Sequence, residues 1–213
     1  MKGRKSLFVV SAPSGAGKTT LVHHFLQNNP EFFATVSHTS RLPRSGEKEG
    51  KNYYFVSDRT FEALIQQQYF IEYAKVHGHY YGTSWQEIND KRKKGPVVLE
   101  IDVQGAEQIR TRFPESVLIF ILPPSMRILA DRLRKRSAES KEVCDFRLKN
   151  AEQELKKAYF FDYCIVNDVF EKAAKDLTTI FKAEKLAEKL AVKKNQAILE
   201  TLIKEAEQGV RDV

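Results

Sequence analysis

A short glycine-rich segment near the start of the chain has the residue types of a phosphate-binding loop. Ser14-Gly15-Ala16-Gly17-Lys18-Thr19 follows an apolar run and opens a helical pattern. Glycines in such a loop let backbone N–H groups converge on a polyphosphate, and the N-terminus of the following helix adds a favourable field. Lys18 would reach the transferring phosphate, and the Thr19 hydroxyl could ligate Mg²⁺. The segment therefore predicts a nucleotide site; the alternative is a flexible glycine-rich turn with a surface lysine.

The loop departs from the strict G-x-x-x-x-G-K-[ST] pattern at one position, because Ala12 stands where the first glycine belongs. Alanine adds only a methyl group, so we expect the loop to tolerate it. A dinucleotide site of the G-x-G-x-x-G type is excluded, since Thr20 occupies the third glycine position. The residues expected to surround the polyphosphate are Ala12, Pro13, Ser14, Gly15, Ala16, Gly17, Lys18 and Thr19.

A second chemical signal is an apolar run that ends in acids, Val97-Val98-Leu99-Glu100-Ile101-Asp102. Strands of this kind hold Mg²⁺ in phosphate-loop proteins, and Asp102 is best placed to do so through water molecules. The predicted metal ligands are therefore Thr19 and Asp102. Glu100 and Asp102 also have a purely structural interpretation, because acids favour strand ends and helix N-termini in any case.

These signals lie on a pattern of alternating strands and helices. The apolar runs typical of buried strands are Leu7–Val10, Val97–Ile101, Val117–Leu122 and Tyr163–Val166. Amphipathic stretches separate several of them, with helices expected over about 18–27, after Asp102 and from near Ser125. This alternation predicts an α/β fold with a parallel sheet.

Residues 35–95 interrupt the alternation. They begin with a polar loop, and Ser84 and Glu87 have the spacing of a capping box at the start of a later helix. Between these features we expect three short strands, Tyr53–Val56, Phe70–Tyr73 and His79–Tyr81, and one helix, Phe61–Gln68. We interpret this segment as a small α+β insert on the parallel core.

The rest of the chain is predicted to be mostly helical, since it contains no proline after Pro124. Residues 126–157 are rich in arginine. The tail from about Glu171 has one long helical pattern with apolar positions on one face. Residues 191–213 are expected to form its C-terminal extension.

Composition excludes several classes of protein. The 213 residues are 42% hydrophobic and include 14 Phe and 8 Tyr, which argues against a disordered chain. Cys144 and Cys164 have no metal-ligand or CxxC spacing, so neither a disulfide scaffold nor a structural zinc is expected, and a reducing, cytoplasmic location fits. No stretch approaches the roughly 18 apolar residues of a membrane span. The formal charge of +7 suits anionic ligands without requiring nucleic acid.

A motif in the insert resembles the signature of the guanylate kinases, which has two arginines three apart, a proline between them, then Gly-Glu and a tyrosine. It stands at Ser37-His38-Thr39-Ser40-Arg41-Leu42-Pro43-Arg44-Ser45-Gly46-Glu47, followed by Tyr53. Further matches occur in the family's order at residues 70–72, 78–83, 101–105, 123–125 and 165–168. The resemblance covers about residues 5–185. Without it, residues 41–51 would be interpreted as a solvated basic loop.

The resemblance implies a single domain of known type. This is a P-loop three-layer α/β sandwich whose five-stranded parallel core comprises residues 1–34, 96–125 and 158–190. Residues 35–95 would be the GMP-binding insert and residues 126–157 a helical lid. The implied reaction is the Mg²⁺-dependent transfer of a phosphoryl group from ATP to GMP.

The resemblance also implies a role for individual residues. The GMP contacts would be Ser37, Arg41, Arg44, Tyr53, Glu72, Tyr81, Thr83, Glu100 and Asp102, and the ATP contacts would be residues 12–19 and Asn167. The catalytic charges would be Lys18 and the lid arginines Arg132, Arg136 and Arg147. Arginine forks suit a monophosphate, and a carboxylate at Glu72 fits the donors of guanine but opposes the N1 lone pair of adenine. Asn167 has an alternative as a buried cap on a strand end.

Other functions stay open at this point. Guanylate-kinase-like binding modules typically lose the phosphate loop or the lid arginines, whereas this chain keeps both. A kinase for another nucleoside monophosphate is disfavoured by Glu72 and Thr83, and a nucleic-acid binder by the lack of a recognisable reading module. The expected partners are ATP and GMP or dGMP, with a homodimer open and no nucleic acid or membrane.

Overall fold

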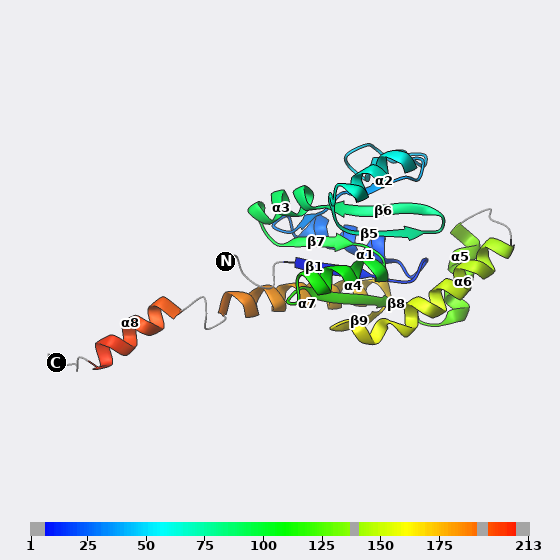
Figure 1. Cartoon of the computed structure of the whole chain (residues 1–213). Helices are drawn as coiled ribbons and strands as arrows, with labels where there is room; N and C mark the ends of the chain where they lie inside the picture. The colour runs from blue at the N-terminus through cyan, green and yellow to red at the C-terminus, as the bar shows by residue number, and fades with distance from the viewer. Residues whose placement is uncertain (1–6, 137–140, 191–195, 208–213) are drawn as a thin grey trace.

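The centre of the protein is a five-stranded parallel sheet, seen in a computed structural model that describes residues 7–136, 141–190 and 196–207 (Figure 1). The strands follow the order β2-β7-β1-β8-β9, and every neighbouring pair is parallel. They are β1 (Leu7–Ser11), β2 (Phe33–Ala34), β7 (Val97–Glu100), β8 (Val117–Leu122) and β9 (Tyr163–Val166). The predicted α/β fold with a five-stranded parallel core is confirmed.

Helices cover both faces of this sheet, because successive side chains of a strand point to opposite sides. Phe8 of β1 packs in one cluster with Phe25 and Phe181, whereas Val9 packs in a second cluster with Ile109. The helices that supply these partners are α1 (Lys18–Asn28), α4 (Val103–Arg112) and α7 (Phe170–Leu190). The result is the predicted three-layer sandwich.

The segment between β2 and β7 forms a second sheet of four strands in the order β4-β3-β6-β5. Its elements are β3 (Ser37–Thr39), β4 (Tyr53–Phe55), α2 (Asp58–Gln66), β5 (Phe70–Val76), β6 (His79–Ser84) and α3 (Trp85–Lys94). Serine caps begin both helices: Ser57 Oγ accepts from the Thr60 N–H, and Ser84 Oγ accepts from the Glu87 N–H. The Glu87 carboxylate accepts from the Val36 N–H at 3.0 Å, which ties α3 to the chain entering this sheet.

Two helices follow β8 and lie beyond the carboxyl end of the parallel sheet (Figure 1). They are α5 (Met126–Arg136) and α6 (Lys141–Lys156), with a short 3-10 helix, η1 (Ala158–Phe160), leading into β9. Leu129 and Leu133 of α5 pack against Ala151 of α6. Residues 137–140, between the two helices, lie outside the described part of the chain.

The tail was expected as one long helical pattern and is described as two helices, α7 and α8 (Gln196–Glu207), with residues 191–195 outside the described part. Figure 1 shows α8 beyond the end of α7 and away from both sheets. Across the described residues, every helix is too short or too polar to cross a membrane.

Two strands, β2 and β3, were not predicted from the sequence. They have two and three residues, respectively, so neither shows a periodic pattern. Their pairing partners come from distant parts of the chain: Phe33 aligns with Val97, and Thr39 with Tyr81. Strands this short are defined by those partners rather than by their own residues.

Candidate active site

A cleft opens where the phosphate loop, the carboxyl end of β7 and the four-stranded sheet meet. It is lined by Ala12, Pro13, Ser14, Gly15, Gly17, Lys18, Thr19, Ser37, Tyr53, Glu72, Val76, His77, Tyr81, Glu100, Ile101, Asp102 and Glu154. The structure thus brings together most of the residues predicted to contact the two nucleotides. Ala16, Thr83, Arg41, Arg44, Asn167 and the lid arginines are not among the residues that line it.

The phosphate loop has the backbone conformation that its glycines predict. Gly15 and Gly17 have φ angles of 90° and 94°, in the region that residues with a side chain rarely adopt. Asn167 donates from Nδ2 to the Ala16 carbonyl at 2.8 Å, and its amide would collide with a Cβ at Gly17. Asn167 therefore supports the loop from behind, and the structure favours its interpretation as a buried, hydrogen-bonded asparagine.

Lys18 stands at the end of the phosphate loop, and its side chain reaches across the cleft to the end of β7. Its Nζ donates to the Ile101 carbonyl at 2.9 Å, at the end of β7. This contact orients the ammonium group toward the acids that follow the strand. The ammonium group is thereby held beside the loop, where it could contact a bound phosphate.

The acids at the end of β7 take two different positions. Glu100 accepts a short hydrogen bond from the Thr19 hydroxyl. Asp102 caps α4: its Oδ1 accepts from the Gly105 N–H at 2.9 Å and its Oδ2 from Gln104 at 3.1 Å. Asp102 therefore has the helix-capping role that was its structural alternative, while it also lines the cleft.

The oxygen donors in this corner suit a magnesium ion. Thr19, Glu100 and Asp102 present hydroxyl and carboxylate oxygens, the ligands that Mg²⁺ prefers. Across the described residues, no group of three or more His, Cys, Asp or Glu side chains forms a protein-only metal cage. Mg²⁺ is usually bound through one or two protein groups, substrate phosphates and water.

Glu72 is a carboxylate buried on the insert side of the cleft, with 2% of its surface exposed. Thr83 is its hydrogen-bond partner, and the Thr83 hydroxyl also lies 3.0 Å from Ser37 Oγ. Among the described residues, Glu72 Oε1 has no partner. Burial raises the pKa of Glu72 to about 7. An acceptor held without a donor at the edge of a cleft is a feature of a ligand site.

Gly105 allows Glu72 to occupy this position. A Cβ at Gly105 would stand 2.6 Å from Glu72 Oε2. The glycine lies in the first turn of α4, where a side chain would push the carboxylate out of place. The sequence contained this residue within a matched motif but gave no signal of its role.

Replacement of Glu72 by glutamine should change stability in a pH-dependent way. The folded pKa of about 7 exceeds the ordinary value of 4.5, so the protonated form stabilises the fold fully below pH 4.5, and this contribution is lost as the pH rises through 7. Glu72→Gln should therefore be more stable than the parent by about 1–3 kcal/mol at pH 8 and equal to it near pH 4.5. Urea unfolding at both pH values measures this, with the exposed Glu152→Gln as control. An equal difference at both pH values would contradict the assignment.

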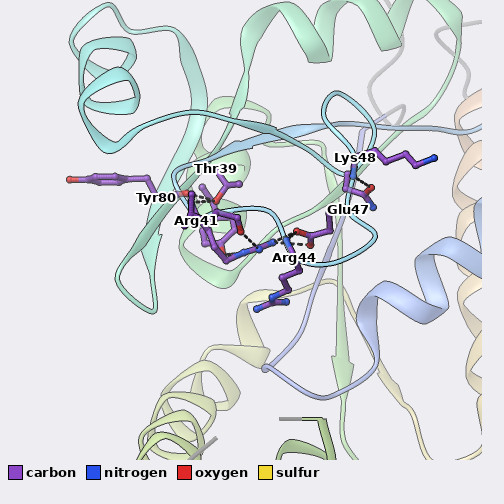
Figure 2. Close-up of polar contacts among 9 residues, drawn as sticks. Thr39, Arg41, Arg44, Glu47, Lys48 and Tyr80 are labelled. Carbon is purple, nitrogen blue, oxygen red and sulfur yellow. Dashed lines mark hydrogen bonds and ion pairs between the residues drawn. The ribbon is translucent and has the colours of Figure 1, made fainter. Parts of the chain in front are cut away.

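The basic loop of the insert is organised around Glu47 (Figure 2). Arg41 Nη2 donates to both carboxylate oxygens of Glu47, at 2.8 and 3.0 Å, and the Arg44 N–H donates to the same carboxylate at 2.7 Å. The Arg44 side chain extends away from Glu47 (Figure 2). One guanidinium nitrogen of Arg41 is thus paired with an anion of the chain itself, a partner that was not anticipated from the sequence, while Nη1 donates to the Leu42 carbonyl at 2.6 Å.

Two tyrosines connect this loop to the cleft. Arg41 Nε donates to the Tyr81 hydroxyl at 3.3 Å, and its guanidinium lies 5.6 Å from the centre of the Tyr53 ring. Burial raises the pKa of Tyr53 to about 12, so its phenol stays a hydrogen-bond donor at neutral pH. Both tyrosines line the cleft and would face an anion bound there.

The predicted lid arginines occupy different places. Arg132 Nη2 donates to the Asn167 carbonyl at 3.0 Å, and Arg132 lines a second hollow behind the phosphate loop, together with Gly15, Gly17 and Lys135. Among the described residues, its buried Nη1 has no acceptor. Arg147 lies on α6 and interacts with another residue of the protein. Arg136 ends α5, and its side chain lies outside the described part.

Glu154 of α6 is a cleft residue that sequence reasoning missed. The Ser14 backbone N–H faces its carboxylate. The helical periodicity of α6 alone does not show that this position faces the phosphate loop. Its position depends on how α6 packs against distant parts of the chain.

A phosphate loop after the first strand, an acid-ended neighbouring strand and a facing anion site define a P-loop kinase for a small phosphate-bearing substrate. Comparisons with known proteins agree. The guanylate kinase family model matches residues 4–184. The chain is 50% identical to a guanylate kinase of Neisseria gonorrhoeae over 182 residues, 85% of this chain and 89% of that protein. It is 48% identical to that of Pasteurella multocida over 202 residues, 93% and 97% of the two chains.

A solved structure gives the same assignment. The guanylate kinase from Anaplasma phagocytophilum superimposes with a TM-score of 0.71 at 36% identity, covering 86% of this chain and 87% of that one. The chain therefore belongs to the guanylate kinase family and is a kinase.

Proposed function

We propose the following roles for the residues of this site in the reaction ATP + GMP ⇌ ADP + GDP. The observation that carries the assignment is that the phosphate loop and the buried carboxylate of Glu72 open onto one cleft. ATP would bind with its phosphates on residues 12–19, and GMP would lie against the four-stranded sheet. Residues 35–95 would then be the GMP-binding insert and residues 126–157 the lid.

The protein would act by positioning and by positive charge, without a covalent intermediate. Lys18 would stabilise charge on the migrating phosphoryl group, and Arg132, Arg136 and Arg147 would close over it from the lid. The buried Arg132 Nη1, which has no acceptor in the described part of the chain, supports an anion on that side. No general base is needed, because a phosphate oxygen of GMP is already ionised.

Thr19 and Asp102 would hold Mg²⁺, with Glu100 beside them. When bound, the ion would neutralise phosphate charge. The Asp102 carboxylate would do this while still capping α4, which fixes its orientation.

The GMP side divides into a phosphate part and a base part. Ser37, Arg41, Arg44, Tyr53 and Tyr81 would hold the monophosphate. Glu72 would accept from guanine N1–H and the exocyclic amine, and Thr83 or Ser37 would satisfy O6. Support for this comes from the hydrogen bond between Thr83 and Ser37 and from the unpartnered Glu72 Oε1 within the described chain.

The experiment that tests this function is an ADP-release assay with GMP, AMP, UMP and CMP side by side, at saturating ATP with magnesium. GMP should exceed each of the others in kcat/KM by orders of magnitude. Comparable turnover of AMP would overturn the assignment of guanine recognition while leaving the kinase class intact.

Arg41→Lys should raise the KM for GMP by about 10- to 100-fold, because lysine keeps the charge but loses the fork that grips a phosphate in two places. The KM for ATP should stay within about threefold, since the phosphate loop is unchanged. Steady-state kinetics with each substrate varied in turn measures both constants. Arg59→Lys, on the exposed face of α2, is the control. Equal KM values for GMP in the two variants would remove Arg41 from the site.

We also propose a cytoplasmic location, which fits the two free cysteines, and a homodimer joined through α8. Ile198, Leu199, Leu202 and Ile203 of α8 are 45–63% exposed. Residues at this spacing share one face of the helix, and a second copy of α8 would cover them.

Truncation after Lys189 should leave GMP phosphorylation within a few-fold of the parent, because the buried residues of α7, from Ala173 to Phe181, are retained. The truncated protein should sediment as a monomer if α8 joins two copies. Activity and sedimentation velocity of both chains provide the comparison. Loss of activity in a truncated protein that remains folded would show that the extension contributes to catalysis.

A further inference from the structure

Glu154 has no role in the assignments above, although it lies in the cleft with Lys18 and Asp102. It is part of α6, and its carboxylate faces the Ser14 N–H of the phosphate loop. An acid in this position opposes the binding of a polyphosphate. Its presence in the cleft therefore needs a compensating function.

The part of α6 that carries Glu154 is fixed to the core. The neighbouring Leu155 packs against the hydrophobic cluster beneath the sheet, and Lys157 pairs with Glu107 of α4 at 2.8 Å. Figure 1 shows the opposite end of α6 reaching away from the sheet beside the end of α5. Glu154 thus belongs to the anchored base of the helical lid rather than to its outer end.

The phosphate loop is packed against the same base. A Cβ at Gly15 would stand 3.0–3.3 Å from Leu133 and Leu129 of α5, which pack in turn against Ala151 of α6. Gly15 therefore leaves no room for a side chain between the loop and the lid base, and the Ser14 N–H faces Glu154 of that base. The pKa of Glu154 is raised to about 7, mainly by burial and also by the nearby Asp102, and Lys18 and the Ser14 N–H act in the opposite direction.

We propose that Glu154 is a positioning residue: by accepting the Ser14 N–H it fixes the phosphate loop to the base of α6 and sets the distance between Lys18 and the lid. Arg147 stands seven residues earlier on the same helix, which is two turns and nearly the same face. The anchor that fixes the loop therefore also fixes the helix from which Arg147 projects. This inference rests on the proposed roles of Lys18 and Arg147.

The alternative is that Glu154 competes with ATP for the loop. The two hypotheses predict different effects of changing the length and the charge of the side chain at position 154. A positioning hydrogen bond needs an acceptor that reaches Ser14. Glutamine supplies such an acceptor, the side chain of aspartate is too short to reach Ser14, and alanine has no acceptor. A competitor needs negative charge, so glutamine and alanine would both improve nucleotide binding while aspartate would retain part of the effect.

The test compares Glu154→Gln, Glu154→Asp and Glu154→Ala with Glu152→Ala, an exposed position on the same helix. Two quantities are measured: kcat/KM for ATP at saturating GMP, and the affinity for a non-hydrolysable ATP analogue by calorimetry. We expect Glu154→Ala and Glu154→Asp to lose about 10- to 100-fold in kcat/KM for ATP, the size expected for a misplaced catalytic group. Glu154→Gln should stay within about threefold of the parent, and the KM for GMP should change little in all of them.

Several results would overturn the proposal. One is Glu154→Ala behaving like Glu152→Ala, and another is Glu154→Gln losing as much as Glu154→Ala. Tighter binding of the analogue by both Glu154→Gln and Glu154→Ala would establish competition instead. Thermal unfolding of each variant identifies any loss caused by unfolding, and the aspartate variant keeps the test valid if alanine does not fold. Failure of the proposed function would appear separately, as a parent enzyme that binds the analogue but does not phosphorylate GMP.

Discussion

Replacing Lys18 with methionine should lower kcat for GMP phosphorylation by a few hundred-fold. Removing one preorganised group that stabilises transition-state charge typically costs about 3–4 kcal/mol. The structure gives Lys18 this position, because its Nζ is held 2.9 Å from the Ile101 carbonyl, between the loop and the acids that follow β7. Methionine has a similar length and leaves the shape of the loop intact, so the loss should come from charge.

The fold should survive this change. Methionine removes one hydrogen bond, to the Ile101 carbonyl, a net loss of about 1 kcal/mol in unfolding free energy. Urea unfolding should therefore show a small shift, and single-turnover kinetics at saturating substrates should show the rate loss. Lys93→Met, at an exposed lysine of α3, is the matched control. Full activity of Lys18→Met would mean that the loop does not cradle the transferring phosphate.

The features that could be predicted from the sequence are those encoded in short stretches. Leu7–Ser11 and Val117–Leu122 are apolar throughout or nearly so, as strands buried on both faces must be, and both became central strands. The glycines of the phosphate loop require their positive φ angles, so the loop was recognisable before its surroundings were known. Local chemistry was enough in each case.

The features that could not be predicted depend on packing between distant segments. Glu47 pairs with Nη2 of Arg41, and Glu154 faces the Ser14 N–H from a helix 140 positions further along the chain. Both acids are in segments where charged residues are common, so nothing in their neighbourhoods distinguishes them. Gly105 is similar, since only the approach of Glu72 in space shows why a side chain is excluded there.

Such contacts also show how charged side chains are arranged in the site. Arg41 is paired with Glu47, and Lys18 is close to Glu154. Two of the cations proposed to bind phosphate, Lys18 and Arg41, thus already face a carboxylate. Substrate phosphates would replace or join these internal anions, which lowers the free energy gained per contact but keeps the cations oriented before substrate arrives.

Glu72→Gln should reduce the preference for GMP over AMP by about 2–5 kcal/mol, through loss of GMP rather than gain of AMP. As a carboxylate, Glu72 only accepts, which fits the two adjacent donors of guanine. The amide of glutamine replaces one acceptor with a donor, so one guanine contact becomes donor against donor. The site is desolvated, with Glu72 only 2% exposed, and water cannot repair that mismatch.

The measurement is steady-state kinetics of Glu72→Gln with GMP and AMP at saturating ATP. The ratio of the two kcat/KM values should fall mainly because GMP becomes a poor substrate, whereas the KM for ATP should stay nearly unchanged, since Glu72 lies on the insert side of the cleft. Glu62→Gln, on α2 of the same insert, is the control for a charge removed away from the base. An unchanged ratio in Glu72→Gln would show that this carboxylate does not read the base, and the recognition of guanine would then have to be assigned to Ser37 and Thr83, which are hydrogen-bonded to one another at 3.0 Å.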